Sequence, residues 1–225
     1  MTNSIAAFET RHPAGGTIAP HRHEAAYVAI VLEGGYEESS LDGTWLCEPG
    51  DWVVHPRWHF HANRFSSHLS RVLNFELPVP LSPGVWRPRD HAGIPPLDPD
   101  ALAGFLPGLA PRSPRPLPES LDLFVRALRT DTLGSVAGAA RQAGLSREYA
   151  SRLHRRCLGL PPRAVRAEER LRRALTLLGE TRLPLSQVAI EAGFADQAHL
   201  TRAMRAATGR TPGDLRRRAQ VTSVQ

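Results

Sequence analysis

The stretch 184–214 constrains the fold most, because its pattern predicts two helices separated by a tight turn. Gly193 permits the positive φ that such a turn requires, and Asp196 can cap the helix that follows. Apolar residues then recur at helical spacing, at Leu200, Ala203, Met204 and Ala207. This is a helix-turn-helix pattern, in which the second helix is the one that usually enters the DNA major groove.

A weaker copy of this pattern occurs earlier in the chain. Residues 136–146 align with 185–195, and residues 151–162 align with 201–212. The offset is 49 before the turn and 50 after it, so the second copy has one extra residue. An amphipathic helix predicted over 163–180 joins the copies as a stiff spacer, with a rise of about 1.5 Å per residue.

Charge divides the chain into two parts. Residues 119–225 hold 19 Arg and 10 acidic residues, a net charge of +9, whereas residues 1–118 hold 9 Arg and 12 acidic residues, a net charge of −3. The basic part is therefore the candidate for binding a polyanion, with a solvated basic surface as the alternative.

The other compositional signals indicate a cytoplasmic protein. Cys47 and Cys157 form no CxxC pair and fit a reducing compartment. The longest apolar run, 25–32, is too short to cross a bilayer, and no signal peptide is visible. We therefore expect no association with a membrane.

The sequence pattern of the first part of the chain predicts β-strands. Short runs rich in β-branched and aromatic residues alternate with Gly and Pro turns, which favours an antiparallel sandwich or small barrel. The predicted strands are 27–32, 36–41, 44–47, 51–55, 60–65 and 69–75. Residues 77–118 are rich in proline, and we interpret them as an arm and linker with a short helix over 100–106.

The helical part resembles a known family. Residues 119–218, and above all the run GF…DQAHLTRAMR…G.TPGDLR, resemble the DNA-binding domain of AraC/XylS-type transcription regulators. The first copy departs from the family at Ala150, where a larger apolar residue is usual, and at His154, where Phe is usual. The resemblance implies double-stranded DNA, RNA polymerase and a second copy of the chain as partners, in an activator or a repressor.

The outward positions of the two second helices are the candidate DNA-binding residues. Arg suits guanine edges, Gln suits adenine, and Ser, Thr and Ala can meet bases or a thymine methyl, although each side chain could equally contact phosphate or solvent. The candidates are Arg147, Glu148, Ser151, Arg152, Arg155, Gln197, Ala198, Thr201 and Arg202.

Histidines form a second pattern in the β part. His21 and His23 follow Gly15, and His61 follows Gly50, at spacings that resemble the two motifs of cupins. Metal-binding cupins hold a divalent ion with these three histidines, and neutral imidazoles suit Zn, Ni or Fe. In the alternative interpretation the histidines hydrogen-bond within a polar barrel that holds no metal.

The chain departs from the cupin pattern at the fourth ligand. Tyr27 occupies the position where cupins usually have a carboxylate, and Glu24 is an additional candidate ligand that would need a β-bulge to take part. His55 and His59 are extra histidines outside the motif. The candidate ligand-pocket residues are Tyr27, Trp45 and Trp58, with core packing as the alternative for the tryptophans.

Together these patterns predict two domains. A cupin-like jelly-roll barrel over 1–76 senses a small molecule or divalent metal, the linker 77–118 follows, and residues 119–218 form an all-α domain with two helix-turn-helix units before the tail 219–225. The predicted function is a sequence-specific DNA-binding transcription regulator without enzymatic activity. The alternatives are a metal-dependent cupin enzyme with a helical appendage, and a repressor whose barrel is only a dimer scaffold.

Overall fold

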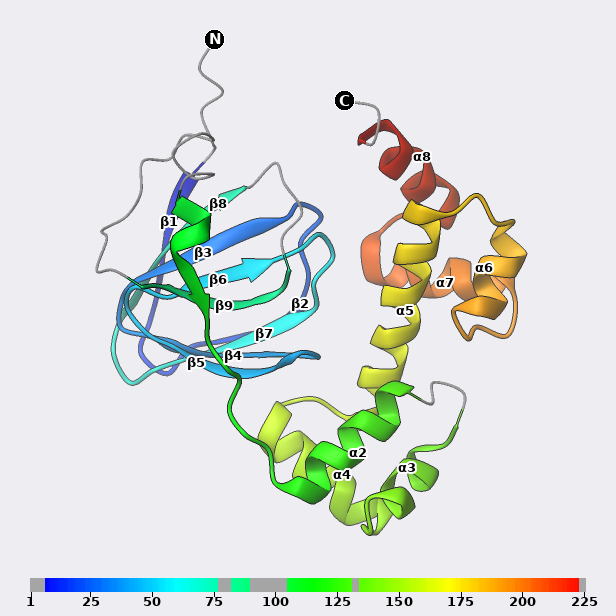
Figure 1. The fold of residues 1–225 in the computed structure, drawn as a ribbon, viewed down its shortest axis with the longest axis horizontal. Helices are drawn as coiled ribbons and strands as arrows, with labels where there is room; N and C mark the ends of the chain where they lie inside the picture. The colour runs from blue at the N-terminus through cyan, green and yellow to red at the C-terminus, as the bar shows by residue number, and fades with distance from the viewer. Residues whose placement is uncertain (1–6, 77–81, 90–104, 131–133, 223–225) are drawn as a thin grey trace. The chain divides into compact units, whose positions relative to one another are not determined.

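The computed structural model describes residues 7–76, 82–89, 105–130 and 134–222. The chain divides into two units, residues 1–116 and 117–225. The first is a β unit and the second is helical (Figure 1), which confirms the predicted order of a β-rich part followed by an α-helical part.

Two antiparallel sheets form the N-terminal unit (Figure 1). The six-stranded sheet has the order β1-β8-β3-β6-β9-β10, and the four-stranded sheet has the order β2-β7-β4-β5. The strands are β1 (Ala7–His12), β2 (Thr17–His21), β3 (Tyr27–Glu33), β4 (Tyr36–Ser40), β5 (Gly43–Cys47), β6 (Trp52–His55), β7 (His61–Phe65), β8 (Ser70–Glu76), β9 (Gly84–Pro88) and β10 (Leu109–Pro111).

Strand β3 is apolar from Tyr27 to Leu32, and both of its faces are buried over residues 28–31. Ala29 and Val31 belong to a core that the two sheets share, together with Phe65 of β7. Val28 and Ile30, which alternate with them, belong to a second cluster on the other side of the six-stranded sheet. Burial on both faces removes the need for polar residues at alternate positions, so the strand appears in the sequence as a continuous apolar run.

The predicted linker is wrong in part. Strands β9 and β10 lie within 77–118 and extend the six-stranded sheet beyond β6. Prolines occur only at the ends of these strands, Pro88 and Pro111, and β10 lies at the sheet edge, where a missing N–H is tolerated. The sequence also gave no indication of β1. The helix expected over 100–106 lies largely outside the described residues, although Phe105 stacks on Trp52 with ring centroids 4.9 Å apart.

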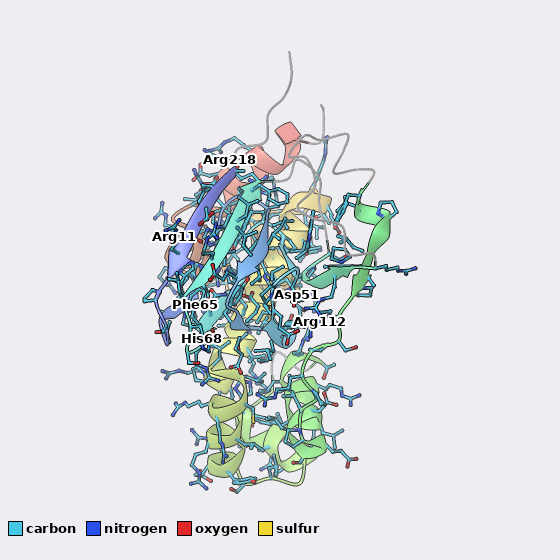
Figure 2. The ribbon with its side chains drawn as sticks, turned by 90° about the vertical axis from the view of Figure 1, so that its left-hand side faces the viewer. Arg11, Asp51, Phe65, His68, Arg112 and Arg218 are labelled. Atoms are coloured by element: carbon cyan, nitrogen blue, oxygen red, sulfur yellow. The ribbon has the colours of Figure 1, made fainter. Side chains whose placement is uncertain are left out.

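A buried carboxylate fixes the late strands to the rest of the β unit. Asp51, which is fully buried, accepts hydrogen bonds from Arg87 Nε of β9 at 2.7 Å and from the backbone N–H of Glu48 at 2.8 Å. It also pairs with Arg112, just after β10. Asp51 and Arg112 lie against one another in Figure 2. This cluster makes the segment through residue 112 an integral part of the β unit.

Seven helices occur in the described part of the C-terminal unit (Figure 1). They are α2 (Glu119–Thr130), α3 (Val136–Gln142), α4 (Arg147–Leu158), α5 (Pro162–Glu180), α6 (Leu185–Glu191), α7 (Gln197–Thr208) and α8 (Pro212–Thr222). The pairs α3–α4 and α6–α7 repeat with the offsets of 49 and 50 seen in the sequence, and α5 joins them.

The predicted helix boundaries are confirmed by the caps. Ser146 accepts a hydrogen bond from the N–H of Tyr149, and Asp196 accepts one from the N–H of His199. Gly159 and Gly209 end α4 and α7 in the left-handed conformation, with φ of 68° and 71°. The two second helices therefore begin and end in the same way.

Candidate functional site

Helices α4 and α7 each present a polar face at their N-terminal ends. On α4, Arg147, Glu148, Arg152 and Arg155 are exposed, while Ser151 is half-buried. On α7, Gln197, Ala198 and Arg202 are exposed, while Thr201 is half-buried. The structure thus places every DNA-binding candidate on the outward face of its helix, since the inward faces are fully buried at Ala150, His154, Leu200 and Met204.

The candidates on α7 lie around one shallow, open depression. Its lining consists of Gln197, Ala198, Thr201 and Arg202. Thr201 Oγ1 donates to the carbonyl oxygen of Gln197 at 2.8 Å, which fixes its hydroxyl along the helix. On α4, the guanidinium of Arg152 lies 6.0 Å from the ring centroid of Tyr149. Both helices therefore offer guanidinium and polar groups on accessible surfaces.

The β unit contains a cavity of about 200 Å³. Apolar side chains from both sheets line it, among them Ile18, Phe65 and Val72, together with the polar side chains of Asn63 and Asn74. The cavity is smaller than the roughly 300–1,000 Å³ of pockets that hold drug-sized ligands. Any organic ligand that enters it is correspondingly small.

Three predicted histidines meet at this cavity. His21, His23 and His61 each offer one ring nitrogen, and these atoms lie within 4.8 Å of one another. The Nε2 atoms of His21 and His23 are 3.0 Å apart, and the Nδ1 of His21 contacts the carbonyl oxygen of Ala19 at 2.9 Å. With Nδ1 donating to that carbonyl, Nε2 of His21 keeps its lone pair for a ligand. The three residues therefore fit a divalent metal in number and donor type.

Tyr27 lies where a fourth ligand would be expected. Its hydroxyl is 3.0 Å from Nε2 of His61, and its ring stacks on His55 with centroids 4.4 Å apart. Burial raises the pKa of Tyr27, so the phenol stays neutral and donates to His61. Tyr27 lines the cavity, as its assignment to a ligand pocket requires.

Two tryptophans and one glutamate do not join this site. Trp45 is buried in the shared core, and its Nε1 donates to the carbonyl oxygen of Arg112 at 3.1 Å. Trp58 adopts a positive φ of 62° in a turn, where its N–H donates to the carbonyl oxygen of His23. Neither lines the cavity. Glu24 is likewise absent from the groups of possible metal ligands found among the described residues.

A second group of possible ligands was missed by the sequence analysis. Glu38, His55, His59 and His61 each offer one atom, and these atoms also lie within 4.8 Å of one another. His55 and His59 stood out only as extra histidines, and Glu38, one of two adjacent glutamates, gave no signal of its own. The strand pairing of β4 with β7 brings Glu38 opposite Asn63 and so into the same polar cluster.

Burial sets the protonation of these groups. It lowers the pKa of His61 to about 3, with a further contribution from the neighbouring His21, and lowers the pKa of His55 well below its usual range. Burial also lowers the pKa of His23 and raises the pKa of Glu38 well above its usual range. The imidazoles of His23, His55 and His61 are therefore neutral near pH 7, which is the state that binds metals.

Comparison with known proteins gives matches to the helical unit. A family model described as a helix-turn-helix domain matches residues 139–218. The arabinose operon regulatory protein of Salmonella typhimurium is 33% identical over 86 residues, which cover 38% of this chain and 31% of that protein. The HTH-type transcriptional regulator GlxA of Rhizobium meliloti is 38% identical over 80 residues, which cover 36% of this chain and 25% of that protein. The match thus spans less than a third of the length of these curated relatives.

A search of solved structures matches a transcriptional regulator with an AraC-type DNA-binding domain from Chromobacterium violaceum. The identity is 27% and the TM-score is 0.42, and the match covers 44% of this chain and 91% of that one. The match to ToxT from Vibrio cholerae covers 95% of this chain and 98% of the ToxT chain, with 9% identity and a TM-score of 0.44.

None of the helices in the described part of the chain has both the length and the apolar content needed to cross a lipid bilayer.

Proposed function

We propose that this chain is a sequence-specific DNA-binding transcription regulator of the AraC type, whose C-terminal unit matches a helix-turn-helix family model over residues 139–218. The observation that carries the proposal is the repeated helix pair, in which α4 and α7 have matching caps and outward polar faces. In this proposal the pairs α3–α4 and α6–α7 are two helix-turn-helix units, and α5 sets the spacing between them. The net charge of +9 over 119–225 supplies the sequence-independent attraction to phosphate.

In this proposal the first two turns of α4 and α7 recognise the bases. Arg152 and Arg202 occupy equivalent positions in the repeat and are both exposed, so each can reach a guanine edge. Gln197 can read adenine, and Ser151 and Thr201 can contact either bases or phosphate. Two such helices on a rigid spacer can enter successive major grooves, which lie roughly 34 Å apart on one side of the duplex.

The β unit is proposed to be a cupin-like jelly-roll sensor. Its effector is either a small organic molecule in the cavity or a divalent metal such as Zn, Ni or Fe held by His21, His23 and His61. An effector regulates only if it binds one arrangement of the protein more tightly than another. The protein partners proposed from the family resemblance are RNA polymerase and a second copy of the chain. The protein is proposed to act in the cytoplasm, either as an activator or as a repressor.

An enzymatic role is not favoured. The matched relatives carry names of regulators rather than enzymes. A metal-dependent cupin enzyme would also leave the repeated helix pairs without a role. Metal analysis of protein purified without chelator or histidine tag, alongside the His21→Ala variant, tests for a metal effector. Absence of metal would leave an organic ligand or a β unit that serves only as a dimer scaffold.

Substitution of the two arginines tests DNA binding. We expect Arg152→Ala and Arg202→Ala each to weaken binding to a duplex selected by the chain from a random pool by about tenfold or more. Arg126→Ala is the matched control, because Arg126 is exposed on α2 and pairs with Asp122 within that helix. The control should lose much less affinity, although it removes the same charge. Equal losses in all three variants would contradict base recognition by α4 and α7.

A further inference from the structure

Glu38, His55, His59 and His61 form an inner group, which shares only His61 with the group that contains the outer histidines, His21 and His23. We propose that this inner group is a binding site for a divalent first-row transition metal such as Zn²⁺ or Co²⁺. The inference goes beyond the proposed function, because metal binding here requires neither DNA nor the two outer histidines.

The spacing of the donor atoms matches metal coordination. Nδ1 of His55 lies 3.3 Å from Nδ1 of His59 and 3.7 Å from Oε1 of Glu38. Ligand atoms at the corners of a tetrahedron with bonds of roughly 2.0–2.1 Å are themselves about 3.4 Å apart. Two of the separations among these three atoms are therefore close to those that one bound ion would impose, and His61 offers a fourth donor atom within 4.8 Å of the others.

Neighbouring groups orient two of the four ligands, Glu38 and His59. Asn63 Nδ2 donates to Oε2 of Glu38 at 2.5 Å, and the remaining Oε1 is buried and accepts no hydrogen bond from the described residues. Asp42 Oδ2 lies 3.2 Å from Nε2 of His59, so that nitrogen donates to the carboxylate and Nδ1 keeps its lone pair. Carboxylate and amide partners of this kind typically fix the tautomer and orientation of metal ligands.

The donor atoms of the inner group are not all satisfied by one another. Glu38 is 2% exposed, and the Glu38–His55 contact at 3.7 Å is too long for a hydrogen bond. The Nδ1 atoms of His55 and His59 lie 3.3 Å apart, so either a proton or a metal ion between them can satisfy both nitrogens. A divalent ion would take the place of such protons and accept lone pairs from the carboxylate oxygen and from both nitrogens at once.

The donor set also selects the metal. Three imidazole nitrogens with one carboxylate oxygen suit Zn²⁺, Fe²⁺, Co²⁺ or Ni²⁺, whereas Ca²⁺ and Mg²⁺ prefer shells made of oxygen. His55 and His61 are each 2% exposed, while His23 is exposed. A metal at the inner site would therefore exchange with solvent more slowly than one at the outer histidines.

Cobalt titration of the full chain, freed of metal and of any histidine tag, tests the inference. We expect one equivalent of Co²⁺ with visible absorption bands in the wild type and in a His21→Ala/His23→Ala double variant. Glu38→Gln and His59→Ala should each lower the affinity by at least about tenfold, and Asp42→Asn should lower it by about 10–100-fold through His59. Tryptophan fluorescence establishes that each variant is folded.

Two results would overturn the inner site: no stoichiometric Co²⁺ or Zn²⁺ in the wild type, or binding that is lost in the double variant and kept in His59→Ala. The first would mean that the cluster is only a hydrogen-bonded polar core. Binding of a selected DNA duplex, measured on the same samples, separates this inference from the proposed function. If the chain binds the duplex but takes up no stoichiometric metal, only the inner metal site is refuted. If it takes up metal but binds no duplex, only the proposed role as a transcription regulator is refuted.

Discussion

Replacement of Asp51 by Asn should destabilise the β unit strongly. The carboxylate accepts hydrogen bonds from Arg87 and from the N–H of Glu48, and it also pairs with Arg112. These contacts connect the turn before β6 to β9 and to the segment after β10. An amide of the same shape has one acceptor oxygen instead of two, so at least one of the arginines would face an N–H₂ group.

The size of the effect follows from burial. Breaking a buried ion pair by removing one partner costs roughly 3–5 kcal/mol. Arg87 and Arg112 are 41% and 30% exposed and both keep Glu48 as a partner, so the lower end of that range applies. We therefore expect Asp51→Asn to lower the free energy of unfolding by about 3 kcal/mol. With a urea m-value of roughly 2 kcal/mol/M, the midpoint falls by about 1.5 M.

Urea unfolding followed by tryptophan fluorescence measures this, because all four tryptophans lie in the β unit. Glu48→Gln is the matched control, since Glu48 pairs with the same two arginines but is 46% exposed. Its loss should stay below about 1 kcal/mol, as for other surface ion pairs. Equal midpoint shifts in the two variants would refute the reasoning that burial of Asp51 makes the cluster important.

Three further predictions concern single side chains. Burial lowers the pKa of His154, so the helical unit should lose stability as pH falls below about 6.5, and His154→Phe should remove this loss in circular dichroism melts at pH 5 and 8. Gly34→Ala should lower the free energy of unfolding in urea by at least about 2 kcal/mol, because the added Cβ would overlap the carbonyl oxygen of Leu69. Gly50→Ala is the control: Gly50 also has a positive φ but has open space around the added Cβ, so the loss should be about 1 kcal/mol. Tyr27→Phe removes a hydrogen bond to Nε2 of His61, so Co²⁺ titration should give an affinity no weaker than that of the wild type.

The helical unit could be predicted from the sequence almost to its boundaries. Its signals are local: caps at Ser146 and Asp196, terminating glycines at 159 and 209, and apolar residues at helical spacing. The repeat added a second, independent copy of each signal. Every candidate DNA-binding residue lies on an outward face because that face follows directly from the helical period.

The β unit was less predictable because its important contacts are distant in the sequence. Prolines made residues 84–88 and 109–111 resemble a linker, and only the pairing of β9 with β6 and of β10 with β9 identifies them as strands. Asp51 and Arg112 are far apart in the chain, as are Glu38 and Asn63. The motif of His21, His23 and His61 was visible as a spacing, whereas Glu38 and His59 become a cluster only through the sheet register.

Footprinting tests the central claim most directly. The full chain would be used to select duplexes from a random pool, and contacts on the enriched sequence would be mapped base by base. Two protected major-groove segments about one helical turn apart are expected, with Arg152→Ala relaxing the preference in one segment and Arg202→Ala in the other. Failure to enrich any sequence, or a footprint that neither substitution alters, would contradict the claim that α4 and α7 each recognise one segment of the DNA.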